Sequence, residues 1–330
     1  TLFPYTTLFR SINPISIEPH RKTQTDAPVS EPERASLRGL IGSLQYAAVN
    51  TRPDLSSRLS QLQSSINSAT IENLQEANRL LHEAKRHHDV TITIKSIPPK
   101  QFRFMGFSDA SFASVKKPDS HAGLIIVGTH QNISENKQCV ISPISWGSRK
   151  IQKVVTSTLS AETNALASAV DQLSWLRLFW EWLHNPKTPW KKPEEALTRI
   201  APAISVATSP AEMDVAVTDC KSLFDLITRT APPQCAEFRV ALVARAIKDS
   251  LQEGIDLRWV STGAQLVDAL TKVMESQFLR ETLRLGTYKL TDESSLLRDR
   301  ARTRDRVQWL KQQSNENHSN ENAVQSTKEK

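Results

Sequence analysis

Four acidic residues lie in stretches that are otherwise apolar, and their placement is the clearest chemical signal in the chain. Two of them end predicted strands, one lies on the buried stripe of a predicted helix, and one interrupts the apolar side of a later helix. The strand-end residues are Asp109 and Asp219, the residue on the long helix is Glu162, and the residue on the later helix is Asp268. Each alone has an ordinary explanation, because an Asp at a strand end commonly caps a turn or a helix. The case for chemistry therefore rests on all four together.

Burying four carboxylates in one place is unfavourable. Each ion loses several kcal/mol of hydration free energy, and like charges raise one another's pKa. No Arg or Lys lies within these apolar stripes. Divalent cations that prefer oxygen ligands would neutralise such a cluster, and two ions about 3.5–4 Å apart suit in-line displacement at phosphorus. The acids therefore predict a metal-dependent site for phosphoryl chemistry.

The elements that must position these acids follow from changes in the hydrophobic period. Helical spacing predicts helices over residues 33–90, and the period changes to two after Pro98-Pro99. Strands are then predicted at 102–108, 122–128, 140–146, 213–218 and 256–260, and helices at 158–183, 222–228, 237–252 and 264–273. This order favours an α/β fold, a mixed five-stranded sheet with helices on its faces, whose first three strands form an antiparallel meander.

Four segments carry a specific combination of motifs. They are FMGFSDASFA, the long stretch that begins ISWGSRK and contains SAETNALASA, then VAVTDCKSLFDL, and LRWVSTGAQLVDALTK. In these segments the chain resembles the ribonuclease H domain of copia-type long-terminal-repeat retrotransposons. The resemblance places Asp109, Glu162, Asp219 and Asp268 on the family's four metal-binding catalytic acids. It implies two Mg²⁺ ions, or Mn²⁺ in their place, and hydrolysis of the RNA strand of RNA–DNA hybrids.

An upstream region carries a second part of the resemblance. LRGLIGSLQYAAVNTRPDLSSRLSQLQ and ATIENLQEANRLLHEAKRH are similar to the thumb and connection helices at the end of the same polyprotein's reverse transcriptase. No Asp-Asp pair of the polymerase type occurs in the sequence, so no polymerase active site is expected in this chain. The resemblance covers about residues 33–275 and implies that the remaining reverse transcriptase is a partner.

The sequence departs from the family pattern in two places. AEFRVALVARAIKD stands where the family often has a segment with a histidine, so a His that aids product release or proton transfer is in doubt. His121-Ala122-Gly123 replaces a Ser-Gly pair, and His121 is predicted to be a loop residue rather than a catalytic one.

Basic residues near the predicted strand ends are candidates for contacts with the nucleic-acid backbone. They are Lys116, Lys117, Arg149, Lys150 and Lys153. Such contacts position a duplex without reading its sequence, and telling RNA from DNA needs contact with the 2′-hydroxyl. A solvated surface side chain is the alternative explanation for each. The formal net charge of +7 permits a polyanionic partner without requiring one.

Composition excludes several other classes of protein. The chain of 330 residues has no apolar run long enough for a membrane span, so no membrane is expected among its partners. Three cysteines, Cys139, Cys220 and Cys235, are too few for a disulfide framework and indicate a reducing compartment. We expect a protein that is not secreted and that lies in the cytoplasm, in virus-like particles, or in the nucleus.

The chain is expected to divide into five segments. Residues 1–11 are similar to a translated sequencing adapter, so an assembly scar is expected there, with a short apolar leader as the alternative. Residues 12–34 are predicted to be a linker, 35–98 reverse-transcriptase helices, 100–275 the ribonuclease H-like domain, and 290–330 a disordered polar tail.

Two rival functions stay open at this point. The first is a decayed element remnant that at most binds nucleic acid weakly, which the departures above favour and the four intact acids oppose. The second keeps the fold but makes the chain another nuclease or a transposase. Proteins of that kind lack the reverse-transcriptase-like helices, which disfavours this alternative.

Overall fold

The computed structural model describes residue 9 and residues 11–113, 119–184, 213–232, 235–272, 274 and 276–291. The described residues up to Leu290 form one compact unit. Of the predicted disordered tail, 290–330, only Leu290 and Thr291 are described, and Leu290 is buried in the core. No helix in the described ranges has the length and apolar character needed to cross a bilayer.

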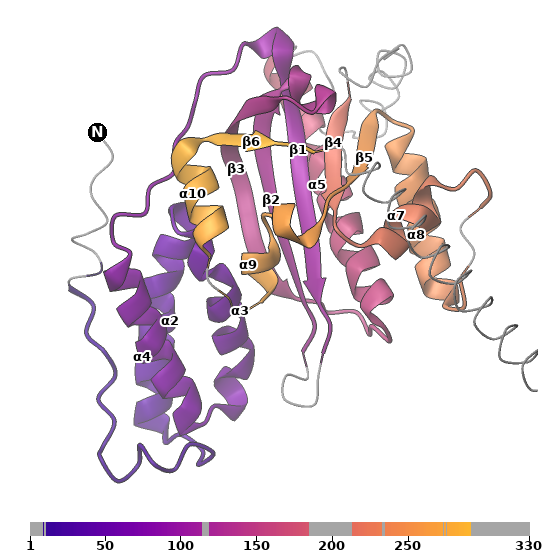
Figure 1. Cartoon of the computed structure of the whole chain (residues 1–330). Helices are drawn as coiled ribbons and strands as arrows, with labels where there is room; N and C mark the ends of the chain where they lie inside the picture. Colours follow the sequence, from indigo (N-terminus) through magenta and orange to yellow (C-terminus); the bar gives the residue numbers. More distant parts are fainter. Residues whose placement is uncertain are drawn as a thin grey trace, which may run out of the picture. The chain divides into compact units, whose positions relative to one another are not determined.

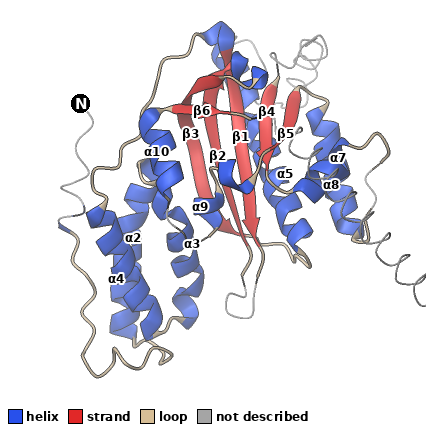
Figure 2. Cartoon of the chain, viewed as in Figure 1, coloured by secondary structure: helices blue, strands red, loops and turns tan. Residues whose placement is uncertain are grey.

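A mixed sheet forms the centre of the compact unit (Figures 1 and 2). Its strand order is β5-β4-β1-β2-β3-β6. The bounds are β1 Phe102–Ser111, β2 His121–His130, β3 Gln138–Lys150, β4 Asp214–Thr218, β5 Ile255–Trp259 and β6 Thr287–Lys289. β1, β2 and β3 form an antiparallel meander, whereas β4 and β5 run parallel to β1. This arrangement confirms the predicted ribonuclease H-like α/β fold, with β6 as an additional short strand paired with β3.

Helices cover both faces of the sheet. α5 (Thr158–His184), α7 (Lys221–Thr228) and α8 (Phe238–Leu251) pack on one face, and α9 (Asp268–Thr271) and α10 (Gln277–Leu285) on the other. The alternation of β1 explains both cores, because Phe104 faces Leu166 of α5 while Phe107 faces Leu270 of α9.

The predicted helix over 264–273 is only one turn long in the structure. A 3₁₀ turn at Thr262–Ala264 precedes it, and α9 spans only Asp268–Thr271. Between them Gln265 has an extended backbone, with φ −79° and ψ 114°. Its side-chain Nε2 donates to the carbonyl of Ser108 at 3.0 Å, so a contact with β1 replaces the continuous helix.

In the described part of the chain, three labelled α-helices precede the sheet. They are α2 (Glu31–Asn50), α3 (Ser56–Ser65) and α4 (Ile71–Arg86), and a 3₁₀ turn, Pro53–Leu55, joins the first two. We call these elements the helical segment; their apolar stripes form a core of their own. Ser30 caps α2 in a capping box with Glu33.

The segment predicted to be a linker packs against these helices. Ile17 and Val29 are buried in their core, and the Asn78 side chain bonds both backbone groups of Ile15, at 2.7 and 2.9 Å. α2 also starts within the predicted linker, at Glu31. Within the expected scar, Phe9 is buried, with the Arg52 guanidinium 5.4 Å from its ring centroid. Residues 9 and 12–34 thus contribute to the packed core.

An ion pair between Arg177 and Asp214 connects α5 to the end of the sheet where β1 and β4 begin. Arg177 Nε donates to Asp214 Oδ2 at 2.9 Å, and its other nitrogens donate to the carbonyls of Glu253 and Gly254. Asp214 Oδ1 accepts from the backbone amide of Phe104 at 2.9 Å. The Arg177–Asp214 pair therefore connects α5, β4, β1 and the turn before β5.

Replacing Arg177 by Met is expected to lower the free energy of unfolding by about 3–5 kcal/mol, because Asp214 would remain buried without its cation. Chemical denaturation measures this change. The matched control is Arg245→Met, which removes an exposed pair with Asp249 and should cost about 0.5 kcal/mol or less. Equal effects of the two changes would contradict the role given to Arg177.

Candidate active site

The sheet brings the first two acids together. β1 and β4 are paired in parallel from Met105–Val215 to Phe107–Val217. Asp109 lies two residues beyond the last pair on β1, and Asp219 lies two residues beyond it on the β4 side. Because parallel strands end at the same edge, both side chains come to one place. Asp109 is 1% exposed and still within β1, so it does not end its strand as predicted.

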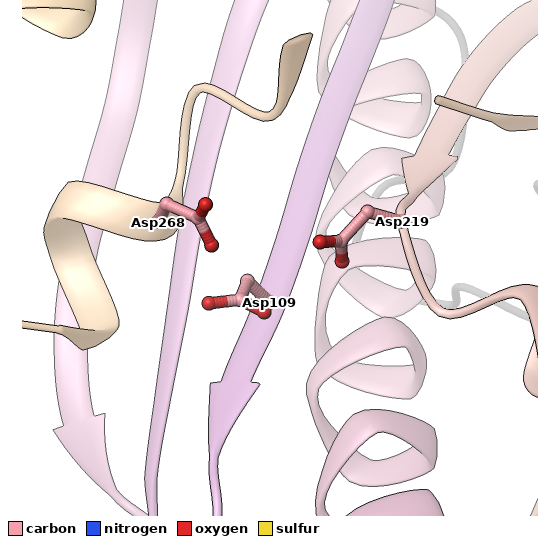
Figure 3. Close-up of side chains that lie close together, drawn as sticks. All are labelled: Asp109, Asp219 and Asp268. Atoms are coloured by element: carbon pink, nitrogen blue, oxygen red, sulfur yellow. The ribbon is translucent and has the colours of Figure 1, made fainter. Parts of the chain in front are cut away.

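Asp268 reaches the same place from α9, which packs on the sheet face that Met105 and Phe107 also face. It is the first residue of α9, which lies directly on β2. A Cβ atom added at Gly123 would lie 2.7 Å from Thr271 Cγ2 and 2.8 Å from Val267 Cγ1, so only glycine permits this approach. Carboxylate oxygens of the three Asp residues lie within 4.8 Å of one another (Figure 3).

Glu162 approaches from α5 and lies outside this closest group of three. It is 6% exposed, and its Oε2 has no hydrogen-bond partner among the described residues. Burial, together with the charges of Asp109 and Asp219, raises its pKa to about 9. Such a buried oxygen without a partner needs either a proton or a cation.

The other acids are also short of positive charge. Burial raises the pKa of Asp109 to about 6, although Lys272 and the Thr271 hydroxyl act against the rise. Burial and the charge of Asp268 raise the pKa of Asp219 as well. Both directions follow from desolvation and like-charge repulsion.

Sequence reasoning missed one cation of the site. Lys272 lies outside the apolar stripes, four residues after Asp268, and its Nζ is 2.5 Å from Asp268 Oδ1 and 3.6 Å from Asp109 Oδ2. The spacing of four residues was the available signal. One ammonium among four carboxylates leaves a net negative cluster, which fits the raised pKa values.

The residues present fit divalent metal. The donor set consists of carboxylate oxygens, which hard cations such as Mg²⁺ and Mn²⁺ prefer. Cations at this position would satisfy both the unpartnered oxygen of Glu162 and the excess of negative charge. The candidate ligands that lie closest to one another are Asp109, Asp219 and Asp268. Glu162 is the fourth candidate ligand.

Side chains of β5, of the 3₁₀ turn after it and of α9 hold two of the acids in place, and the sequence did not reveal this. Trp259 Nε1 donates to the backbone carbonyl of Asp219 at 3.0 Å, and Thr262 Oγ1 to its carboxylate at 3.1 Å. The Thr271 hydroxyl donates to Asp109 Oδ2. These contacts join residues 40 or more positions apart, which periodicity cannot reveal.

The candidate backbone contacts that the structure describes lie at or just beyond the end of β3, at the same end of the sheet as the acids. Lys150 pairs in register with His121, which in turn pairs with Ser111 at the end of β1. Arg149, Lys150 and Lys153 are exposed, and Lys150 Nζ is 2.6 Å from Asp119 Oδ1. Lys116 and Lys117 lie outside the described residues.

His121 differs from its prediction as a loop residue. It is the first residue of β2, is 4% exposed, and its Nε2 has no hydrogen-bond partner in the described part of the chain. Burial lowers its pKa. β2 begins one residue before the apolar run AGLIIVG, so His121 belongs to the strand. By alternation, His121 lies on the same buried face as Ile125 and Val127.

The chain is similar to retrovirus-related Pol polyproteins of transposons, which confirms that part of the predicted resemblance. Two such relatives come from Arabidopsis thaliana. The Pol polyprotein from transposon RE1 is 27% identical over 165 residues, covering 49% of this chain and 10% of the relative. That from transposon RE2 is 29% identical over 147 residues, covering 44% and 9%. The matched segments thus span about a tenth of these relatives. No protein-family model matches the chain.

Two solved structures show a weak likeness. One is the N-terminal ribonuclease H domain of a Mycobacterium tuberculosis protein, with TM-score 0.31 and 10% identity, covering 56% of this chain and 96% of that one. The other is a foamy viral protease-reverse transcriptase in complex with an RNA/DNA hybrid, with TM-score 0.39 and 13% identity, covering 79% and 28%. At these values the fold assignment rests on the strand order of this chain itself.

The raised pKa of Glu162 predicts a pH dependence of stability in the metal-free protein. The folded state holds this proton with a pKa of about 9 instead of 4.5. The resulting stabilisation is complete below about pH 4.5 and is lost as the pH rises towards 9. The protein in EDTA should therefore melt at a lower temperature at about pH 8 than at about pH 5, and Glu162→Gln should reduce this difference.

Thermal unfolding at several pH values measures the effect. Asp171→Asn, an exposed acid on the same helix, is the matched control and should keep the wild-type dependence. A Glu162→Gln variant with the wild-type pH dependence would show that Glu162 titrates normally.

Proposed function

We propose that this chain hydrolyses the RNA strand of RNA–DNA hybrids with the help of divalent metal. The observation that carries the proposal is the meeting of acids from β1, α9 and the end of β4, beside Glu162 of α5, at one edge of a ribonuclease H-like sheet. The similarity to transposon Pol polyproteins supports the same substrate class, because reverse transcription produces such hybrids.

Four residues would share the work of holding metal. Asp109, Asp219, Asp268 and Glu162 are the proposed ligands. When bound, two Mg²⁺ ions would activate the attacking water and stabilise the leaving oxygen of the phosphodiester. Thr271 and Thr262 donate hydrogen bonds that orient the carboxylates of Asp109 and Asp219.

Binding of the duplex is proposed for the exposed basic residues at the same end of the sheet. Arg149 and Lys153 are exposed there, and Lys150 would have to exchange its contact with Asp119 for a phosphate. Lys116 and Lys117 complete the proposed set. Contacts of this kind position the hybrid without selecting its sequence.

The context of this activity is proposed on the resemblance of the motifs. We assign the element to the copia type, with the helical segment as the end of its reverse transcriptase and the remaining polymerase part as partner. The proposed location, in virus-like particles in the cytoplasm or in the nucleus, follows from reverse transcription.

Cleavage of a labelled RNA–DNA hybrid tests the proposal. The chain should release fragments with 3′-hydroxyl and 5′-phosphate ends in Mg²⁺ or Mn²⁺, and EDTA should stop the reaction. Asp219→Asn should reduce the rate to about one hundredth or less, because loss of a direct ligand should cost at least as much as loss of a residue that supports one. Asp225→Asn, on the exposed side of α7, should cleave at the wild-type rate.

Two results would contradict the proposal. Cleavage that continues in EDTA or in Asp219→Asn would remove the metal mechanism. A wild-type chain that binds Mn²⁺ and leaves the hybrid intact would support the alternative of an inactive remnant.

A further inference from the structure

The turn that carries Asp268 is too short to hold its own position. α9 has four residues, fewer than an isolated helix needs by a wide margin. Packing on Gly123 supports one side of it. It also contacts β1 and β3 of the sheet, and it packs on α3 and the 3₁₀ turn Pro53–Leu55, which belong to the helical segment. The reverse-transcriptase-like helices therefore lie directly behind the candidate active site.

An ion-pair network joins the helical segment to α10, the helix that follows α9. Arg280 of α10 donates from Nε to Asp54 Oδ2 at 2.9 Å and from a terminal nitrogen to Glu83 Oε1 at 2.7 Å. The side chains of Arg280 and Asp54 are 15% and 1% exposed. On its other side α10 buries Leu279 and Leu283 in the core that also contains Leu270 of α9.

Both acids that Arg280 contacts have another arginine partner if Arg280 is removed. Arg52 binds Asp54 through two nitrogens, at 2.9 and 2.8 Å, and Arg58 pairs with Glu83. Burial would raise the pKa of Asp54, but the hydrogen bonds and charges of Arg52 and Arg280 hold it below its usual value. Each acid therefore keeps one arginine in an Arg280 variant, so its fold should survive.

We propose that the helical segment is part of the nuclease site, and that Arg280 is a positioning residue that holds α9, and with it Asp268, in place. α3 and the 3₁₀ turn Pro53–Leu55 pack against α9 and support it. The contacts of Arg280 hold α10, the helix that follows α9. The inference rests on the proposed function only for the task given to Asp268.

Amide hydrogen exchange on the full chain in EDTA tests the clamp without metal or substrate. In Arg280→Met, amides of residues 266–272 should exchange at least about tenfold faster, while those of β2 stay protected. Arg280→Lys, which keeps the charge, should restore part of the protection. Arg284→Met removes an exposed pair with Glu281 on the same helix and should leave residues 266–272 unchanged.

Mn²⁺ titration is the second readout. Arg280→Met should bind Mn²⁺ about tenfold or more weakly, as is typical when a residue that supports a metal ligand is lost, and Arg284→Met should bind it normally. Unchanged exchange at 266–272 in Arg280→Met, or equal acceleration throughout the sheet, would overturn the inference. A wild-type chain with the expected exchange pattern but no Mn²⁺ binding would contradict the proposed function and leave the clamp standing.

Discussion

Repulsion among buried carboxylates is the interaction on which the rest of the site depends. Three Asp residues have oxygens within 4.8 Å of one another, and Glu162 adds a fourth buried acid nearby. Lys272 and the hydroxyl of Thr271 compensate only part of this charge. The remaining negative charge, together with burial, raises the pKa values of Asp109, Asp219 and Glu162. Protons can supply the missing positive charge, and divalent cations can supply it while the carboxylates stay deprotonated.

Holding like charges together requires a rigid frame, and the chain provides it from distant segments. The parallel pairing of β1 and β4 fixes Asp109 and Asp219, and the long α5 carries Glu162. The one-turn α9 is the weakest member of this frame. Its support comes from Gly123 on one side and from the helical segment on the other. Two regions that the sequence assigns to different domains therefore meet at one site.

The sequence predicted those parts of the fold that depend on local periodicity. The strands β1 to β5 and the long helix α5 follow from alternation and helical spacing, and the same faces pointed to all four acids. β6 was missed because three residues carry no period, and α9 was predicted too long because Gln265 bonds to β1 instead of continuing a helix. Lys272 and the packing of residues 12–34 depend on contacts between distant segments, which periodicity does not encode.

The central claim is that these acids form a binding site for divalent metal. Anomalous diffraction from crystals grown with Mn²⁺ tests it most directly, because the ions are located without reference to activity. The account predicts anomalous peaks within coordination distance of the Asp109, Asp219 and Asp268 carboxylates, with Lys272 Nζ displaced from Asp268. Anomalous density absent from this position, with Lys272 still bound to Asp268 in the presence of Mn²⁺, would contradict the account.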